Sequence, residues 1–148
     1  MNLLLDENVP VQALPVLQRT LRGHQVDHVD SLDRRGTRWK GKKDRQLLPD
    51  AGTAGYEVFV TKDSNQLADP VETRLIKQSG IHHVRFQQDE GVAGYARAVG
   101  ALVAAMADVV AELDTASGQR LVRIVKLDPK KRRHETVDPD IDPPSYWR

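Results

Sequence analysis

Acidic and amide side chains follow directly after two runs of apolar residues, and these side chains are the kind that bind divalent metal ions. Asp6, Glu7 and Asn8 come after three consecutive leucines, and Asp63 comes shortly after Val-Phe-Val-Thr at residues 58–61. Apolar runs without alternation predict strands that are buried on both faces of a parallel sheet. Because ligands bind beyond the carboxyl ends of such strands, the sequence predicts a polar site where these two strands end.

A third acid, Asp44, lies in the most basic interior segment, residues 33–45. This segment carries seven cations around Trp39, which are Arg34, Arg35, Arg38, Lys40, Lys42, Lys43 and Arg45. Such a charge run is usually a solvated loop, but a carboxylate within it is better explained as a metal ligand whose neighbours bind a polyanion. Trp39 would either stack on an unpaired base or pin the loop as a hydrophobic peg, and Lys62 would either contact a phosphate or stay solvated.

These positions define a candidate metal site. Asp6, Asp44 and Asp63 are the candidate ligands, and the polar residues beside them are Glu7, Asn8, Thr61 and Asn65. Oxygen ligands without histidine or thiolate suit Mg²⁺ or Mn²⁺. Such an ion polarises a phosphodiester and makes a water nucleophile available at neutral pH, so the predicted chemistry is metal-assisted hydrolysis.

The elements that must position these residues follow from hydrophobic spacing. We expect an α/β fold with a mostly parallel sheet, whose strands lie near residues 2–8, 25–29, 57–61, 81–86 and, at the edge of the sheet, 121–127. The helices are expected at residues 45–54, 70–78 and 92–113, together with an earlier helix that either begins with Pro15 in its first turn or is kinked there. Alanines along the longest helix are explained by core packing, and they would also permit contact with a second copy in a homodimer.

Residues 128–148 change in character from the rest of the chain. A basic run, an acidic run and four prolines predict a flexible C-terminal arm without regular elements, next to a single domain at residues 1–127. The two aromatic residues near the end, Tyr146 and Trp147, are either disordered or an anchor that folds onto a partner or a second subunit.

Composition narrows the class of protein. The chain has 148 residues, a formal net charge of +1 and no cysteine, which excludes disulfides, thiolate metal sites and cysteine nucleophiles. The sequence shows neither a leader pattern nor an apolar run long enough to span a bilayer. We therefore expect a soluble cytoplasmic protein without a membrane partner.

Several of these motifs, taken in order, resemble a known family. Leu3-Leu4-Leu5-Asp6-Glu7-Asn8-Val9-Pro10, then Gly23-His24, then Asp44 before Leu47-Leu48-Pro49, and Val60-Thr61-Lys62-Asp63-Ser64-Asn65 look like the PIN-like ribonuclease domains of VapC-type toxins, over about residues 1–87. The resemblance implies a three-layer α/β/α PIN-like fold, an endoribonuclease that depends on Mg²⁺ or Mn²⁺, and a cognate antitoxin that blocks the site of this toxin-antitoxin pair.

The resemblance also implies roles for individual residues. Asp6, Asp44 and Asp63 would be metal ligands, and Thr61 would help to order the attacking water or the scissile phosphate. Asn65 stands where this family often carries a fourth acid, which leaves open whether one or two metal ions bind.

Two other functions remain as alternatives. A receiver-like signalling domain would use the Asp6-Glu7 pair, a phospho-acceptor at Asp63 and a lysine at Lys126, but it gives Asp44 no role and lacks a serine or threonine after the fourth strand. A catalytically silent PIN fold that binds RNA or a partner would keep the scaffold without turnover.

Overall fold

The computed structural model describes residues 1–36, 38–62, 65–125 and 134–147. The strands are β1 Asn2–Leu5, β2 Gln25–His28, β3 Val58–Thr61, β4 His82–Phe86, β5 Leu121–Ile124 and β6 His134–Val137. The helices are α1 Ala13–Thr20, α2 Val29–Asp33, α3 Asp44–Thr53, α4 Pro70–Ser79 and α5 Gly91–Leu113, with a 3₁₀ turn, η1, at Gln66–Ala68. Pro15 is the third residue of α1, so the helix begins around it and is not kinked by it.

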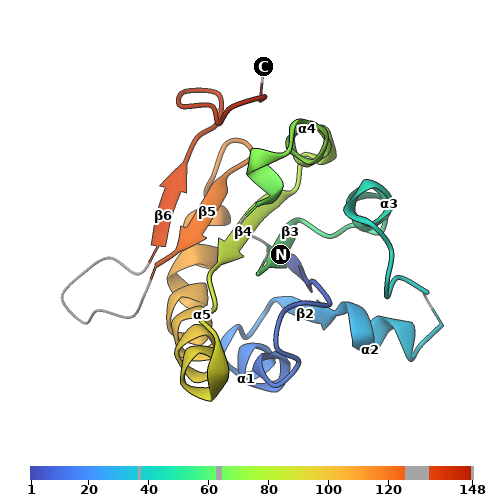
Figure 1. Ribbon diagram of the computed structural model, residues 1–148, viewed down its shortest axis with the longest axis vertical. Helices are drawn as coiled ribbons and strands as arrows, with labels where there is room; N and C mark the ends of the chain where they lie inside the picture. Colours follow the sequence, from blue (N-terminus) through green and yellow to red (C-terminus); the bar gives the residue numbers. More distant parts are fainter. Residues whose placement is uncertain (37, 63–64, 126–133, 148) are drawn as a thin grey trace.

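The strands form one sheet in the order β2-β1-β3-β4-β5-β6, which can be followed across Figure 1. All neighbouring pairs are parallel except β5 and β6, which are antiparallel. β1 lies between β2 and β3, so the strand order reverses there, and the crevice at such a switch point is where open α/β sheets bind ligands. The predicted α/β fold with a mostly parallel sheet is confirmed.

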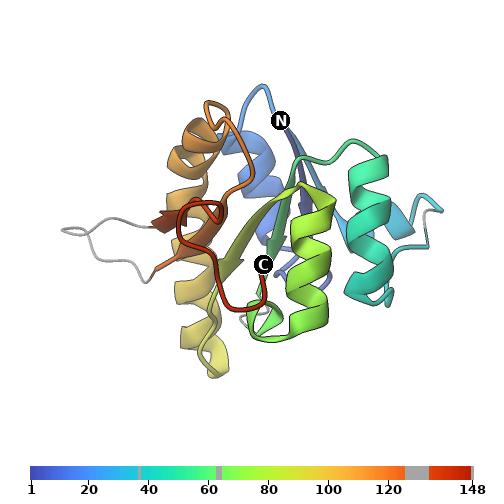
Figure 2. The same ribbon diagram turned by 90° about the horizontal axis from the view of Figure 1, so that it is seen from above.

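Helices cover both faces of the sheet and give three layers, with α1 and α5 on one side and α2, α3 and α4 on the other (Figure 2). Successive residues of β1 point to opposite faces, so Leu3 and Leu5 join the core beneath α1 and α5 while Leu4 joins the core beneath α2 to α4. This double coverage explains why the strand shows no alternation between apolar and polar residues.

Small residues of α5 point into the first of these cores. Ala98, Ala101 and Ala105 are buried together with Leu102 and Met106 against the sheet. Packing within one chain therefore explains these three alanines, and contact with a second copy stays a prediction. In the described part of the chain, no helix is long and apolar enough to cross a membrane.

The prediction of a C-terminal arm without regular elements is wrong for residues 134–137, which form β6. β6 pairs with β5 from Leu121 opposite Val137 to Ile124 opposite His134, so β5 is not the edge strand of the sheet. Prolines exclude only the positions that they occupy and their neighbours, and β6 fits in the proline-free stretch between Pro129 and Pro139.

Trp147 joins the second core instead of a partner. The side chain is 5% exposed and belongs to the cluster beneath α2 to α4. Its backbone carbonyl accepts a hydrogen bond from Lys77 Nζ of α4 at 2.8 Å, and the same ammonium lies 5.7 Å from the centre of the indole ring. The end of the described chain is therefore tied to α4.

Replacing Trp147 with alanine is expected to lower the free energy of unfolding by about 3 kcal/mol, because a large buried aromatic side chain is removed. Tyr146→Ala is the matched control, since Tyr146 is 57% exposed and its loss should cost less than about 0.5 kcal/mol. Urea denaturation measures both variants. Equal stability of the two would contradict the packing of Trp147.

Candidate active site

The carboxylate of Asp6 sits at the point where β1 ends beside β3. Leu5 lies opposite Val60 in the parallel pair, so Asp6 and Thr61 follow as neighbours and share a face of the sheet. Asp6 Oδ2 accepts a hydrogen bond from Thr61 Oγ1 at 2.9 Å, and Asp6 Oδ1 accepts one from the backbone amide of Glu7 at 2.8 Å. Asp6 is 5% exposed and Thr61 is fully buried, so the carboxylate is held in one orientation at the rim of the site.

Asn8 binds the start of the loop that follows β3. Its Oδ1 accepts a hydrogen bond from the backbone amide of Lys62 at 2.9 Å, and its Nδ2 donates to Thr61 Oγ1 at 3.2 Å. In this loop the Lys62 side chain is half-buried and Asn65 is exposed. Of the polar residues predicted at the ends of the two strands, Asp6, Asn8 and Thr61 therefore lie together.

Glu7 brings the basic segment to the same edge. Its Oε2 accepts a hydrogen bond from the backbone amide of Gly41 at 2.7 Å, and α3 begins three residues later at Asp44. Residue 63 and the side chain of Asp44 lie outside the part of the chain that the structure describes. Among the side chains that are described, no group of three acids or histidines is placed to hold a metal ion.

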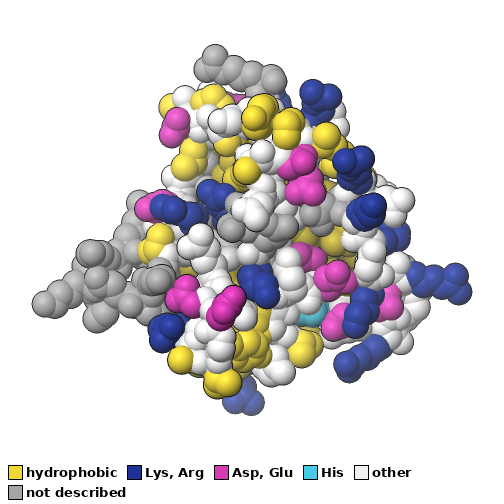
Figure 3. Space-filling model, in the orientation of Figure 1, with side chains coloured by type: hydrophobic (Ala, Val, Ile, Leu, Met, Phe, Trp, Pro, Cys, Tyr) yellow, Lys and Arg dark blue, Asp and Glu magenta, His cyan; other side chains and the backbone are white. Residues whose placement is uncertain are grey.

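Three of the seven cations in the basic segment form ion pairs with acids of the chain itself. Arg35 pairs with Asp27 at 2.8 Å, Lys40 with Asp30 at 3.1 Å and Lys42 with Asp50 at 2.5 Å. The other four, Arg34, Arg38, Lys43 and Arg45, are exposed and form no ion pair with the described side chains. Accordingly, acidic and basic side chains are interspersed over α2 and the loop to α3 in Figure 3.

Trp39 anchors this loop from within. Its side chain is half-buried, and its ring meets that of Tyr56 edge-on, with 5.9 Å between the ring centres. Trp39 therefore packs as a hydrophobic peg, and its stacking on an unpaired base stays a prediction.

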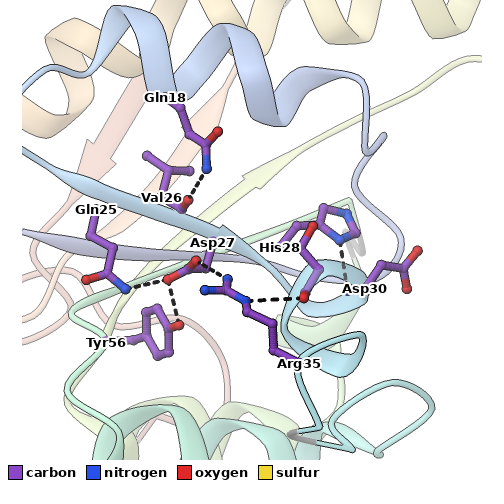
Figure 4. A network of polar contacts seen from close by, with 9 residues as sticks. Gln18, Gln25, Val26, Asp27, His28, Asp30, Arg35 and Tyr56 are labelled. Carbon is purple, nitrogen blue, oxygen red and sulfur yellow. Dashed lines mark hydrogen bonds and ion pairs between the residues drawn. The ribbon is translucent and has the colours of Figure 1, made fainter.

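A polar network around the buried Asp27, which the sequence did not reveal, holds Arg35 in place (Figure 4). Asp27 of β2 accepts hydrogen bonds from Gln25 Nε2, Arg35 Nη2 and the Tyr56 hydroxyl. Burial raises the pKa of Asp27, but the three hydrogen bonds together outweigh it and leave this pKa below its usual value. Burial and the contact with Asp27 raise the pKa of Tyr56. Arg35 therefore fastens the loop to the sheet through Asp27, while 62% of its side chain stays exposed.

His28 fixes the beginning of α2. Its Nδ1 accepts a hydrogen bond from the backbone amide of Asp30 at 3.1 Å, so the ring proton is on Nε2. Nε2 donates a hydrogen bond to the carbonyl of Val9 at 2.8 Å. His28 thus links the turn after β1 to α2.

His83 positions the turn that follows the site loop. It is almost fully buried on β4, and its Nε2 lies 2.8 Å from Oε1 of Gln66, the first residue of η1. Because the amide oxygen only accepts, Nε2 carries the proton and Nδ1 is left without a hydrogen-bond partner. Burial, and then the charge of Arg85, lowers the pKa of His83 to about 3.

Comparison with known proteins found no relative. The chain matches no family model, no curated protein and no solved structure. The class that the fold and the site define is a doubly wound α/β protein with a polar site at the switch point between β1 and β3.

His83 is expected to make folding stability depend on pH. The unfolded chain protonates this imidazole near pH 6.5 and the folded protein only near pH 3, so its contribution is fully present above pH 6.5 and is lost as the pH falls between these values. The loss amounts to about 1.4 kcal/mol per pH unit. Urea denaturation between pH 4 and 7 should show a shallower pH dependence for His83→Gln than for the wild type. Parallel curves would contradict the burial of an uncharged His83.

Proposed function

We propose that the protein is an endoribonuclease that depends on Mg²⁺ or Mn²⁺ and cleaves RNA at the edge where β1 and β3 end. The observation that carries the proposal is the carboxylate of Asp6, which is buried at the switch point of the sheet and oriented by Thr61. Hard oxygen ligands at this position suit either ion. Lys62, just before Asp63, is hydrogen-bonded to Asn8. Gly41, three residues before Asp44, is hydrogen-bonded to Glu7.

In this proposal Asp6, Asp44 and Asp63 hold the ion. The bound ion supplies polarisation of the phosphodiester and a lowered pKa of a water molecule. Thr61 is fully buried and donates a hydrogen bond to Asp6, so its role is to position that carboxylate. Asn8 fixes the backbone of Lys62 and thereby the direction in which the loop toward Asp63 leaves the sheet.

The exposed cations of the basic segment would bind the RNA backbone. Arg34, Arg38, Lys43 and Arg45 are assigned this role because no described acid neutralises them. Arg35, Lys40 and Lys42 would contribute less, since each already has a carboxylate partner.

The proposal extends to the biological setting through the resemblance to VapC-type toxins. The protein would act in the cytoplasm as the toxin of a toxin-antitoxin pair, and the antitoxin would cover the edge that carries Asp6. A homodimer is compatible with this arrangement.

Asp6→Asn should abolish RNA cleavage, with a loss of about 100-fold or more, because an amide binds the ion without neutralising its charge. The measurement is cleavage of a mixed RNA pool with and without Mn²⁺. Asp114→Asn is the matched control, since Asp114 is an exposed acid just after α5.

Thermal unfolding with added Mn²⁺ separates the nuclease from a silent PIN fold. Mn²⁺ should raise the unfolding temperature of the wild type and of Asp114→Asn but not that of Asp6→Asn. Equal cleavage by wild type and Asp6→Asn would contradict the proposed mechanism, and the absence of both cleavage and metal stabilisation would favour the silent fold.

A receiver-like phospho-acceptor domain is the second candidate, and the strand order favours it. The order β2-β1-β3-β4-β5 is the one that receiver domains share with flavodoxin. Against it, β4 is followed by Gln87 and Gln88 where a receiver would need serine or threonine, and β6 adds an antiparallel strand.

Asp44→Asn distinguishes the two candidates. A nuclease should lose cleavage by about 100-fold or more because a metal ligand is removed. A receiver should still form an acyl phosphate on Asp63 when it is incubated with a small phosphodonor, as detected by intact mass. Full cleavage by Asp44→Asn would remove this residue from the proposed metal site.

A further inference from the structure

A row of polar side chains crosses the sheet beyond the candidate active site. Thr61 lies opposite Arg85, Arg85 opposite Arg123, and Arg123 opposite Glu135 on four neighbouring strands. These residues face the α4 side of the sheet, because Val84, Phe86, Val122 and Ile124 alternate with them and fill the core beneath α5. The row therefore begins at the hydroxyl group that holds Asp6.

A hollow of about 230 Å³ opens at this row, and it is lined by Asn65, Arg85, Phe86, Gln87 and Arg123. Asn65 comes from the loop after β3, while Arg85 and Gln87 come from the carboxyl end of β4. The hollow thus lies at the same edge of the sheet as Asp6, which is the edge where open α/β sheets bind ligands.

The charges of the lining favour an anionic ligand. Two arginines stand directly opposite each other on adjacent strands, which is unfavourable for like charges. Arg123 directs Nε and Nη2 to Glu135 Oε2 at 3.1 and 2.5 Å, so the neutralising acid lies on the far side of Arg123 from Arg85. The row Arg85, Arg123 and Glu135 keeps a formal charge of +1, from two cations and one anion.

The burial of Arg85 also favours an anionic ligand. Arg85 is half-buried, and burial followed by the charge of Arg123 lowers the pKa of its guanidinium, although Glu135 acts in the opposite direction. An anion between the two guanidinium groups would relieve both effects. The fork of N–H donors on arginine matches phosphate oxygens, and the amide groups of Asn65 and Gln87 can donate further hydrogen bonds.

We propose that this hollow is a phosphate-binding subsite, in which Arg85 and Arg123 hold a phosphate group of the nucleic acid next to the Asp6-Thr61 edge. The assignment of the phosphate to a nucleic acid rests on the proposed function, whereas phosphate binding itself does not. The subsite lies on the opposite side of Thr61 from the basic segment, so a bound strand would be held on both sides of the metal site.

Phosphate binding is tested in a buffer with EDTA, so that no metal ion or cleavage takes part. The probes are inorganic phosphate in calorimetry and two short RNA oligonucleotides of one sequence in fluorescence anisotropy, one with a 5′-phosphate and one with a 5′-hydroxyl. Arg85→Gln and, separately, Arg123→Gln should weaken binding of phosphate and of the preferred oligonucleotide about tenfold or more. A preference for the 5′-phosphate identifies a terminal phosphate as the ligand, and equal binding of the two oligonucleotides identifies an internal phosphodiester.

Arg22→Gln is the matched control, because Arg22 is an exposed arginine between α1 and β2, at the opposite edge of the sheet. It should bind all probes as the wild type does. Arg85→Lys keeps the charge but loses the fork, so its affinity should fall between those of the wild type and Arg85→Gln. Thermal unfolding of Arg85→Gln shows whether the variant is folded, so that a loss of binding can be assigned to the missing guanidinium group.

The outcomes separate this inference from the proposed nuclease. A wild type that binds none of the probes, or an Arg85→Gln variant with unchanged affinity for all of them, overturns the subsite. Phosphate binding that depends on Arg85, in a protein that does not cleave RNA with Mn²⁺, supports the subsite and overturns the nuclease instead.

Discussion

The registration of β1 against β3 is the constraint on which the candidate site depends. Leu3, Leu4 and Leu5 are fully buried and identical in type, so hydrophobicity alone would tolerate a shift of the strand by one residue. Polar contacts at both ends exclude that shift. Asn2 binds the carbonyl of Gly55 and the carboxylate of Glu57 at one end, and Asp6 and Asn8 bind Thr61 and Lys62 at the other.

The acids and amides at the strand ends could be recognised from the sequence. A buried parallel strand ends where its apolar run ends, and the next residues must face the rim of the sheet. Asp6 and Thr61 could therefore be predicted as neighbours before any coordinates were known. The helical spacing of apolar residues in α5 was equally informative. It predicted a helix at residues 92–113, and the helix spans Gly91–Leu113.

Features that depend on pairing between distant strands were not predicted. β6 is four residues long and lies between prolines, so its sequence carries too little pattern to indicate a strand without its partner β5. Arg85 and Arg123 each interrupt an apolar strand, which was a signal for a polar row, but their direct opposition follows only from the register. The ion pairs that neutralise Arg35, Lys40 and Lys42 likewise join segments that sequence spacing does not relate.

The burial of Trp147 beside residues from α2, α3 and β3 has a consequence for the order of folding. The core beneath α1 and α5 is built from residues up to Ile124, whereas the core beneath α2 to α4 also contains Trp147. During synthesis on the ribosome the first core can close while the second still lacks a large side chain. The face that carries the Asp6-Thr61 edge would then reach its final packing only after residue 147 has left the exit tunnel.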